Sequence, residues 1–443
     1  MLLNFKIKNF RSFRDETNFT MIPSAKKTHS EYVIKEEYDK GTIKALPAAI
    51  IYGANASGKS NIILAMFLFK KIVKKGSLND KILLRFLNLL PFVHDKTYFE
   101  PTELEIIFCQ NKNEYKYGIA FKAEKESYVL TQEYLYINDD QIFNRTQDEG
   151  IQIHTVDLMK KGYIQQSPFN IMFYDMLVSK LNETLDEEQL FLHSGIKNLI
   201  NNESYNDIQQ WFEKFMVVMD ANDVSFEQKD LQAIEISATE SNDELKNRHF
   251  YESDAIKEIV SCAEFGDQEI KFLSDMDSDK LLMVSLYKIP INDETKEIRL
   301  VARAEGMESK GTIQLLRLIQ PFIDALKSGG VIVMDEMDAS LHFELVVSLI
   351  RIFNNKELNK KGAQLIFNTH NPIYLDGELL RHDQVVMVEK SRQDLSSELY
   401  SLVDFGLRPE EKLLKNYLDG KYGALPHIDL EIAFKHIIGD ENR

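Results

Sequence analysis

One glycine-rich octapeptide constrains the fold of this chain more than any other feature. It reads Gly53-Ala-Asn-Ala-Ser-Gly58-Lys59-Ser60 and matches the pattern GxxxxGK[ST] in full. The preceding residues Ala48–Tyr52 (AAIIY) predict a short buried strand, and Lys59–Lys70 predicts an apolar helix without internal Gly or Pro. Strand, loop and helix in this order are the context that a phosphate-binding loop requires.

The residue types in this loop predict a nucleotide site. The backbone amides of such a loop point inward at the β-phosphate, and the N-terminus of the following helix adds partial positive charge. Lys59 is expected to reach the β- and γ-phosphates, and the Ser60 hydroxyl to take one Mg²⁺ position. A chance glycine-rich turn is the alternative, which the strand–loop–helix context disfavours. The predicted nucleotide contacts here are Gly53, Asn55, Ser57, Gly58, Lys59, Ser60 and Asn61.

Hydrolysis of a nucleotide needs a second, acidic site, and the segment VIVMDE (331–336) has the required residues. Its four apolar residues predict a buried parallel strand, which ends in Asp335 and Glu336. Because successive strand side chains point to opposite sides, the two carboxylates cannot do the same job. We predict that Asp335 binds Mg²⁺ through water and that Glu336 acts as the base or orients the attacking water.

A further apolar strand, Gln364–Asn368, is followed by Thr369 and His370. Parallel sheets bind ligands at the carboxyl ends of their strands, so His370 is expected to contact the γ-phosphate or the water. A lone histidine is more often structural. The order of phosphate loop, acidic strand and strand-end histidine favours the catalytic role.

Together these motifs resemble the ABC-type ATPases, in the branch that includes the structural-maintenance-of-chromosomes (SMC) proteins, RecF and the OLD nucleases. The resemblance assigns Asp338 to the D-loop and His370 to the switch histidine. It also implies that Arg11, in the N-terminal segment NFRSF (9–13), approaches the nucleotide. Gln110 and Gln132 are alternatives for the glutamine loop.

The signature loop of that family corresponds to Glu308–Thr312, directly before a predicted helix over Gly311–Lys327. Ser309 and Gly311 match LSGG(Q/E), whereas Lys310 replaces the first glycine. The resemblance implies that Ser309, Lys310 and Gly311 contact the γ-phosphate bound to the opposite subunit.

Longer segments resemble the narrower group of bacterial RloA-like ATPases, which occur in abortive-infection and anti-phage operons and include the ATPase component of PARIS systems. The segments that carry this resemblance are LPFVHD (90–95), ESKGT (308–312), MDEMDASLH (334–342), GAQLIFNTHNPIYLD (362–376), DQVVMVEKSR (383–392), LYSLVDF (399–405) and NYLDGKYGALP (416–426).

The predicted fold class is α/β, an ABC-ATPase-type P-loop fold divided into three regions. Residues 1–154 form a mixed or antiparallel N-terminal lobe, in which residues 102–137 predict an antiparallel meander. Residues 155–265 form a helical insertion, exemplified by the apolar stripe of DIQQWFEKFMVVM (207–219). Residues 266–443 form a parallel C-terminal lobe.

Composition excludes several classes of protein. Two cysteines, Cys109 and Cys262, are too few for a disulfide framework or a four-cysteine metal site. No run of about 18 apolar residues predicts a transmembrane helix. The N-terminus does not resemble a signal peptide, so we expect a cytoplasmic protein without a membrane partner. The net charge of −17 argues against a surface that coats nucleic acid.

The predicted function is ATP hydrolysis to ADP and phosphate, with ATP and Mg²⁺ as cofactors. The resemblance implies a homo-oligomer, at least a dimer, with ATP between subunits. No carboxylate cluster suited to two metals follows His370, so the effector is expected in trans. That effector would be a nuclease, of Toprim type or another, or a toxin in anti-phage defence. A phage-encoded protein would be the trigger, and DNA is not required.

The alternative is a RecF-like ATPase that acts directly on DNA in repair or recombination. Its support is one basic run, Lys70, Lys71, Lys74 and Lys75, although such a run is more often a solvated helix face. A transporter ATPase is disfavoured by the degenerate signature loop. A GTPase is disfavoured because no NKxD-type guanine reader is present.

Overall fold

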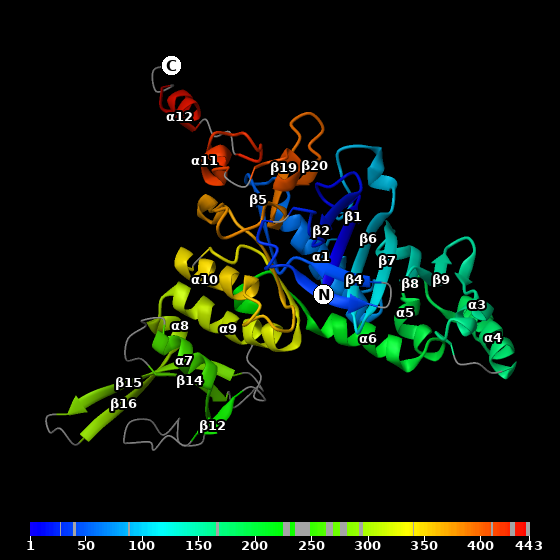
Figure 1. The fold of residues 1–443 in the computed structure, drawn as a ribbon, viewed down its shortest axis with the longest axis horizontal. Coiled ribbons are helices and arrows are strands. Elements are labelled where there is room, and N and C mark those ends of the chain that lie inside the picture. The colour runs from blue at the N-terminus through cyan, green and yellow to red at the C-terminus, as the bar shows by residue number, and fades with distance from the viewer. Residues whose placement is uncertain are drawn as a thin grey trace. The chain divides into compact units, whose positions relative to one another are not determined.

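In the computed structural model the chain forms two units. Figure 1 labels their helices and strands. The first contains Met1 and residues 210–367, and the second contains residues 2–209 and 368–443. The chain passes between them within a helix at residue 209 and at the end of a strand at residue 367. The structure describes residues 1–26, 28–38, 41–86, 89–164, 168–224, 231–234, 249–262, 269–274, 281–291, 296–339, 341–408, 411–425 and 430–439.

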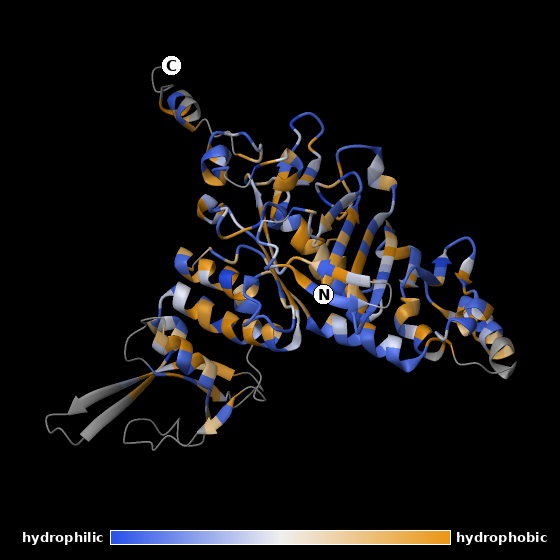
Figure 2. Cartoon of the chain, in the orientation of Figure 1, coloured by the Kyte–Doolittle hydropathy of each residue, from blue (hydrophilic) through white to orange (hydrophobic). Residues whose placement is uncertain are grey.

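A seven-stranded antiparallel sheet forms much of the second unit. Leu3, Phe5 and Ile7 are buried and alternate with half-buried polar residues along the first strand, as predicted. Figure 2 shows hydrophobic and hydrophilic residues mixed along the strands of this unit. The meander predicted over 102–137 is confirmed, because consecutive strands there pair antiparallel. In spatial order the strands are β10 (Gly150–Gln152), β9 (Asp140–Thr146), β8 (Ser127–Ile137), β7 (Asn113–Glu124), β6 (Thr102–Gln110), β1 (Leu2–Lys8) and β2 (Thr17–Thr20).

Three further strands of this unit position the phosphate loop. The fully buried β5 (Ala48–Gly53) pairs parallel with β19 (Val385–Lys390), which pairs antiparallel with β20 (Ser397–Ser401). The helix α1 (Lys59–Lys75) follows the loop, and the ring of its Phe69 packs edge-on against Phe5 of the antiparallel sheet, with 5.8 Å between centroids. The loop is therefore fixed at both ends by buried elements.

Shorter elements complete the second unit. A hairpin is formed by β3 (Ile34–Tyr38) and β4 (Gly41–Ala45). The helices are α2 (Lys81–Leu84), α3 (Thr155–Lys160), α4 (Pro168–Thr184), α5 (Phe191–Ser194), the first part of α6 (Asn202–Lys214), α11 (Leu413–Leu418), α12 (Leu430–Gly439) and the 3₁₀ turns η1 (Lys96–Phe99), η2 (Ile196–Asn198), η6 (Pro372–Tyr374), η7 (His382–Gln384) and η8 (Leu402–Phe405).

The first unit has a parallel and an antiparallel part. The buried strands β11 (Phe215–Val218), β17 (Val331–Met334) and β18 (Gln364–Asn368) are parallel neighbours. The antiparallel sheet runs β12 (Gln232–Ile234), β13 (Phe250–Glu252), β14 (Glu269–Ser274), β15 (Leu281–Ile291) and β16 (Lys296–Arg303). The remaining elements are η3 (Ala221–Asp223), α7 (Asp254–Cys262), α8 (Ala304–Met307), α9 (Lys310–Ser328) and α10 (Phe343–Asn354).

The predicted helix over 207–219 is wrong at its C-terminal end. Helix α6 ends at Lys214, and the following residues FMVV form β11 in register with β17. Valine and phenylalanine favour a strand, and a neighbouring parallel strand satisfies their backbone groups.

The α/β class and the phosphate-loop context are confirmed, whereas the predicted division into lobes stays a prediction. The segment 155–265 contains α3 to α7, but also β11 to β13, over its described residues. Residues 265 and 266, where one predicted boundary falls, lie outside the described residues.

Candidate nucleotide-binding site

The loop between β5 and α1 contains two residues with positive φ. Gly58 has a φ of 114° and Ala56 a φ of 61°. A Cβ on Gly53 would lie 2.4 Å from the carbonyl oxygen of Val388, and a Cβ on Gly58 would lie 2.6 Å from Ser12 Oγ. Close packing around both glycines of the motif therefore leaves no room for a side chain.

Lys59 turns its ammonium toward this loop rather than toward solvent. The side chain is 5% exposed, and Nζ donates to the carbonyl oxygens of Gly53 at 2.8 Å and Ala54 at 3.0 Å. His370 Nδ1 lies 3.4 Å from the same nitrogen. The structure thus brings Lys59, the start of the loop and His370 together.

Two hydroxyls of the loop differ in their surroundings. Ser57 is 2% exposed, and its Oγ has no hydrogen-bond partner among the described residues. Ser60 is exposed, and its Oγ accepts a hydrogen bond from Asn368 Nδ2 at 3.3 Å. A buried hydroxyl without a partner and a buried ammonium in the same loop fit a polyanionic ligand, since both groups can donate hydrogen bonds to it. Of the two asparagines, Asn55 is exposed and Asn61 half-buried.

A backbone hydrogen bond joins the segment that contains His370 to β5. The Thr369 amide donates to the carbonyl oxygen of Ile51 at 3.1 Å, and the Asn371 amide donates to Thr369 Oγ1 at 2.8 Å. Asn368 is fully buried and was not among the predicted site residues. Its position at the end of a strand, two residues before His370, was the available signal.

The acidic pair follows β17 in the first unit. The Asp335 amide donates to the carbonyl oxygen of Val218 at 3.0 Å, which continues the pairing with β11. Glu336 is exposed and has a φ of 46°, and its carbonyl oxygen accepts from the Ala339 amide at 3.0 Å. A left-handed residue other than glycine costs roughly 1–3 kcal/mol and concentrates at functional sites. Asp338 lies half-buried in the same turn.

The signature-like segment begins α9 in the same unit. Ser309 is the N-cap, and its Oγ accepts from the Thr312 amide at 3.1 Å. Ser309 and Lys310 are exposed, while Gly311 is half-buried. An exposed N-terminus of a long helix can bind an anion.

A cavity of about 500 Å³ in the first unit joins two of the predicted motifs. Lys310 lines it together with Asp335 and Glu336 of the same chain. Gln314, which was not predicted, also lines this cavity and donates to the carbonyl oxygen of Met337 at 3.0 Å. The start of α9 and the acidic turn are therefore in direct contact within this unit.

Arg11 is held by contacts with Phe86 and Leu89. Its guanidinium lies over the ring of Phe86, 5.2 Å from the centroid, and Nη1 donates to the carbonyl oxygen of Leu89 at 3.3 Å. The predicted contact of Arg11 with a nucleotide stays a prediction.

Within the part of the chain that the structure describes, no group of three or more His, Cys, Asp or Glu side chains is arranged to hold a metal ion. No helix in the same residues is both long and apolar enough to cross a bilayer. Of the two cysteines, Cys109 is buried and Cys262 is exposed.

Comparison with known proteins identifies the family. No curated protein matches the chain. Among solved structures, the SMC head domain from Thermotoga maritima is similar at 15% identity and a TM-score of 0.36, over 90% of this chain and 98% of that one. A family model described as "AAA domain, putative AbiEii toxin, Type IV TA system" matches residues 48–376, most of the chain. The chain therefore belongs to this family of AAA domains.

Proposed function

We propose that this protein binds ATP with Mg²⁺ and hydrolyses it to ADP and phosphate. The observation that carries the proposal is the buried Lys59 ammonium, which donates to two carbonyls of its own loop and lies beside His370. Loop amides and Lys59 would hold the β- and γ-phosphates, and Mg²⁺ would offset their charge. Ser60 and Asp335 would supply oxygens to Mg²⁺, Glu336 would act as the base or orient the attacking water, and His370 would contact the γ-phosphate or the water.

Two substitutions test this proposal. Lys59→Ala is expected to reduce ATP binding below detection in calorimetry, because the loop loses its only buried cation. Lys71→Ala, an exposed lysine on the same helix, is the matched control and should bind as the wild type does. Glu336→Gln should keep ATP binding and lose about 100-fold or more in kcat. Wild-type turnover in both site variants would rule out this site.

We further propose that subunits enclose ATP between them, at least as a dimer. The exposed Ser309 and Lys310 at the N-terminus of α9, with Gly311 behind them, suit a contact with the γ-phosphate of a partner subunit. ATP would then stabilise the oligomer by mass action, and hydrolysis would weaken it. Glu336→Gln with ATP should give a larger species in light scattering than the same variant with ADP. Equal masses in both conditions would contradict the proposal.

The biological role we propose is control of a separate effector in bacterial anti-phage defence. The family description names a toxin and a type IV toxin–antitoxin system, which supports a role in defence. The effector would be a nuclease, of Toprim type or another, or a toxin, and a phage-encoded protein would trigger its release in the cytoplasm. A strain that carries the gene with its neighbours should lose phage resistance on Lys59→Ala. Unchanged plaque counts would contradict the role in defence but not the ATPase.

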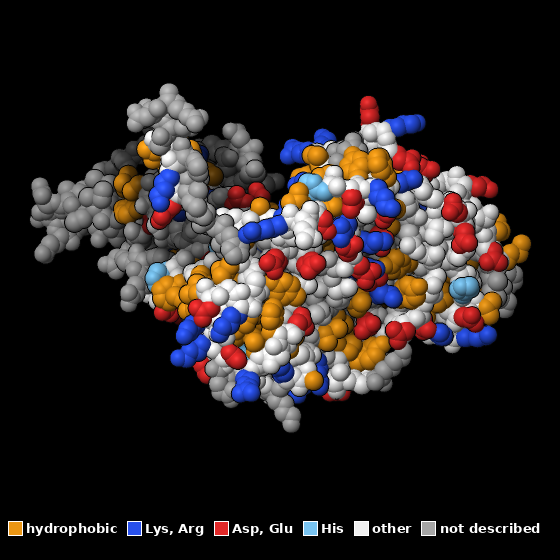
Figure 3. Space-filling view, turned by 90° about the horizontal axis from the view of Figure 1, so that it is seen from above, with side chains coloured by type: hydrophobic (Ala, Val, Ile, Leu, Met, Phe, Trp, Pro, Cys, Tyr) orange, Lys and Arg blue, Asp and Glu red, His pale blue; other side chains and the backbone are white. Residues whose placement is uncertain are grey.

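The alternative, direct action on DNA, has less support than the role in defence, because the basic run on α1 that suggested it is a weak candidate for a DNA-binding surface. Burial, together with Lys74 and Lys71, lowers the pKa of Lys70 to about 8, and Lys75 pairs with Asp80 at 3.5 Å. Acidic and basic side chains are interspersed on the face drawn in Figure 3. Replacement of Lys71 and Lys74 by Gln should leave any affinity for DNA unchanged. If the variant instead binds DNA more weakly than wild type at low salt, and this difference vanishes at high salt, the RecF-like alternative would be favoured.

A further inference from the structure

Two serine hydroxyls pack closely against the phosphate loop at Gly58. Ser12 lies in the turn after β1, and Ser397 is the first residue of β20. A Cβ on Gly58 would lie 2.6 Å from Ser12 Oγ and 2.7 Å from Ser397 Oγ. Ser12 Oγ also accepts from Asn61 Nδ2 at 2.9 Å. Both hydroxyls therefore lie on the side of the loop toward which a Gly58 side chain would point.

Ser397 fixes the orientation of one peptide unit of the loop. Its Oγ donates to the carbonyl oxygen of Ser57 at 2.5 Å, and this contact is buried. In a planar trans peptide the carbonyl oxygen and the following N–H point in opposite directions. Because Ser397 holds the Ser57 oxygen toward itself, the N–H of Gly58 points away from Ser397, and we expect a phosphate to bind on that side.

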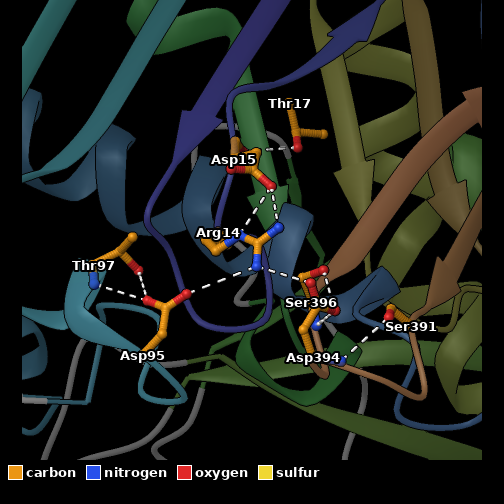
Figure 4. A network of polar contacts seen from close by, with 8 residues as sticks. All are labelled: Arg14, Asp15, Thr17, Asp95, Thr97, Ser391, Asp394 and Ser396. Carbon is orange, nitrogen blue, oxygen red and sulfur yellow. Dashed lines mark hydrogen bonds and ion pairs between the residues drawn. The ribbon is translucent and has the colours of Figure 1, made fainter.

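A polar cluster, shown in Figure 4, holds the two serine-bearing segments together. Arg14 Nη1 donates to Asp394 Oδ2 at 2.8 Å, and Arg14 Nε donates to Asp15 at 3.0 Å. Asp394 also accepts from the Ser396 amide at 3.2 Å and the Ser396 hydroxyl at 2.8 Å. Hydrogen bonds from serine hydroxyls and from the Ser396 amide, with Arg14 nearby, hold the pKa of Asp394 well below its usual range.

A backbone bond joins the two segments directly. The Ser397 amide donates to the carbonyl oxygen of Ser12 at 2.6 Å. The turn after β1 and the hairpin between β19 and β20 thus form one support behind the loop.

We propose that Ser397 and Ser12 are positioning residues for the phosphate loop, which set the orientation of the Ser57–Gly58 peptide and so the affinity for the β-phosphate of a nucleotide. The Arg14–Asp394 pair keeps both serines in register. This inference rests on the nucleotide binding proposed above and adds residues outside the GxxxxGKS motif to the site.

The decisive variant is Ser397→Ala, tested by calorimetry with Mg·ADP on the full chain. Without the Ser397 hydroxyl the Gly58 N–H is no longer held toward the β-phosphate, and the loss of this hydrogen bond to a charged group should weaken ADP binding about tenfold. ATP should lose the same factor, because both nucleotides carry a β-phosphate. AMP lacks it, so AMP binding measured by ligand-observed NMR should not change.

Three comparisons separate positioning from a general loss of structure. Ser397→Thr keeps the hydroxyl and should recover most of the affinity. Asp394→Asn changes a half-buried cluster that touches the loop only through the serine-bearing segments, so it should weaken ADP binding by a smaller factor than Ser397→Ala. Ser401→Ala is the matched control on the same strand, since its hydroxyl lies near the carbonyls of His382 and Val385 rather than the loop. It should bind ADP normally.

The outcomes distinguish this inference from the proposed function. Wild-type ADP affinity in Ser397→Ala, with binding lost in Lys59→Ala, would overturn the inference and leave the nucleotide site intact. An equal loss of AMP and ADP affinity in Ser397→Ala would also overturn it. Wild-type binding in Lys59→Ala would instead overturn the proposed function.

Discussion

The Lys59 ammonium lies 3.4 Å from Nδ1 of His370, although 311 positions separate the two residues in the chain. An ammonium has no lone pair and can only donate a hydrogen bond, so Nδ1 is the acceptor in this contact. The contact links the lysine of the phosphate loop to the histidine that follows β18.

Replacement of His370 by Ala should impair turnover more than binding. The histidine is expected to act on the γ-phosphate or the water, so kcat should fall about 100-fold while the dissociation constant of ADP stays near the wild-type value. Steady-state hydrolysis and calorimetry measure the two quantities. His94→Ala removes an exposed histidine and is the control. A large change in ADP affinity with normal kcat would contradict this role.

A mixing experiment should decide whether Lys310 acts on its own subunit or on a partner. Lys310 lines the cavity of its own Asp335 and Glu336, whereas the resemblance assigns it to the opposite subunit. If it acts on the partner, inactive Lys59→Ala and Lys310→Glu chains should recover about a quarter of wild-type hydrolysis when mixed, since half the dimers are mixed and each has one intact site. A mixture as inactive as its components would place the action of Lys310 within one chain.

Lys70→Met should stabilise the protein at neutral pH. Burial lowers the pKa of Lys70 from 10.5 to about 8, so the folded state disfavours its charge. Removal of that charge should raise the free energy of unfolding by about 1 kcal/mol. Between these two pKa values the unfolded chain binds more protons than the folded one, so the stability of the wild type rises with pH. The difference in the free energy of unfolding between Lys70→Met and wild type should therefore become smaller as pH rises.

Urea denaturation at neutral pH and near pH 10 measures this effect. Lys71→Met is the control, because Lys71 is exposed and should show no such pH dependence. A constant difference between Lys70→Met and wild type at both pH values would argue against the lowered pKa.

Glu133→Gln should destabilise the second unit. The Glu133 carboxylate is fully buried and accepts from the amides of Phe191 at 2.7 Å and Leu192 at 2.9 Å, and from the Tyr117 hydroxyl at 2.9 Å. A glutamine presents an amide nitrogen to one of these donors, which should cost about 1–3 kcal/mol. Denaturation by urea at neutral pH measures the change.

The pH dependence has a defined sign at this residue. Burial raises the pKa of Glu133 above 4.5. As pH rises from 4.5 through the raised value, the unfolded chain loses its proton first, so wild-type stability falls. Glu133→Gln has no carboxyl group at this position to titrate. The difference in the free energy of unfolding between wild type and this variant should therefore become smaller over that pH range. A deficit that widens would show that Glu133 ionises more readily in the folded state.

Local patterns predicted the elements that carry the motifs. The apolar run before the loop became β5, the helix after it became α1, and the apolar stretch of the acidic segment became β17. Each element is defined by residues adjacent in sequence, so periodicity and glycine placement suffice. The helix predicted over 207–219 failed because FMVV is equally apolar as a helix face or a buried strand, and its pairing with β17 decided between them.

The structural role of the C-terminal motif NYLDGKYG could not be predicted from the sequence. In the structure Asn416 donates to the Tyr422 hydroxyl at 3.0 Å and accepts from Lys421 Nζ at 2.7 Å. The ring of Tyr417 lies 6.0 Å from that of Tyr52, directly before the phosphate loop. The motif therefore closes a turn and packs it on β5.

The sequence by itself determined the phosphate loop, its strand and helix, and the residue types of the acidic pair, because those depend on the local backbone and on side-chain chemistry. Only the tertiary structure decided which distant residues surround the loop: His370 beside Lys59, Asn368 beside Ser60, and Ser12 with Ser397 behind Gly58. The backbone bond from Thr369 to Ile51 positions His370 and Asn368, and the bond from Ser397 to Ser12, with the pairing of β5 and β19, positions the two serines. These contacts join residues far apart in the sequence, so local patterns could not predict them.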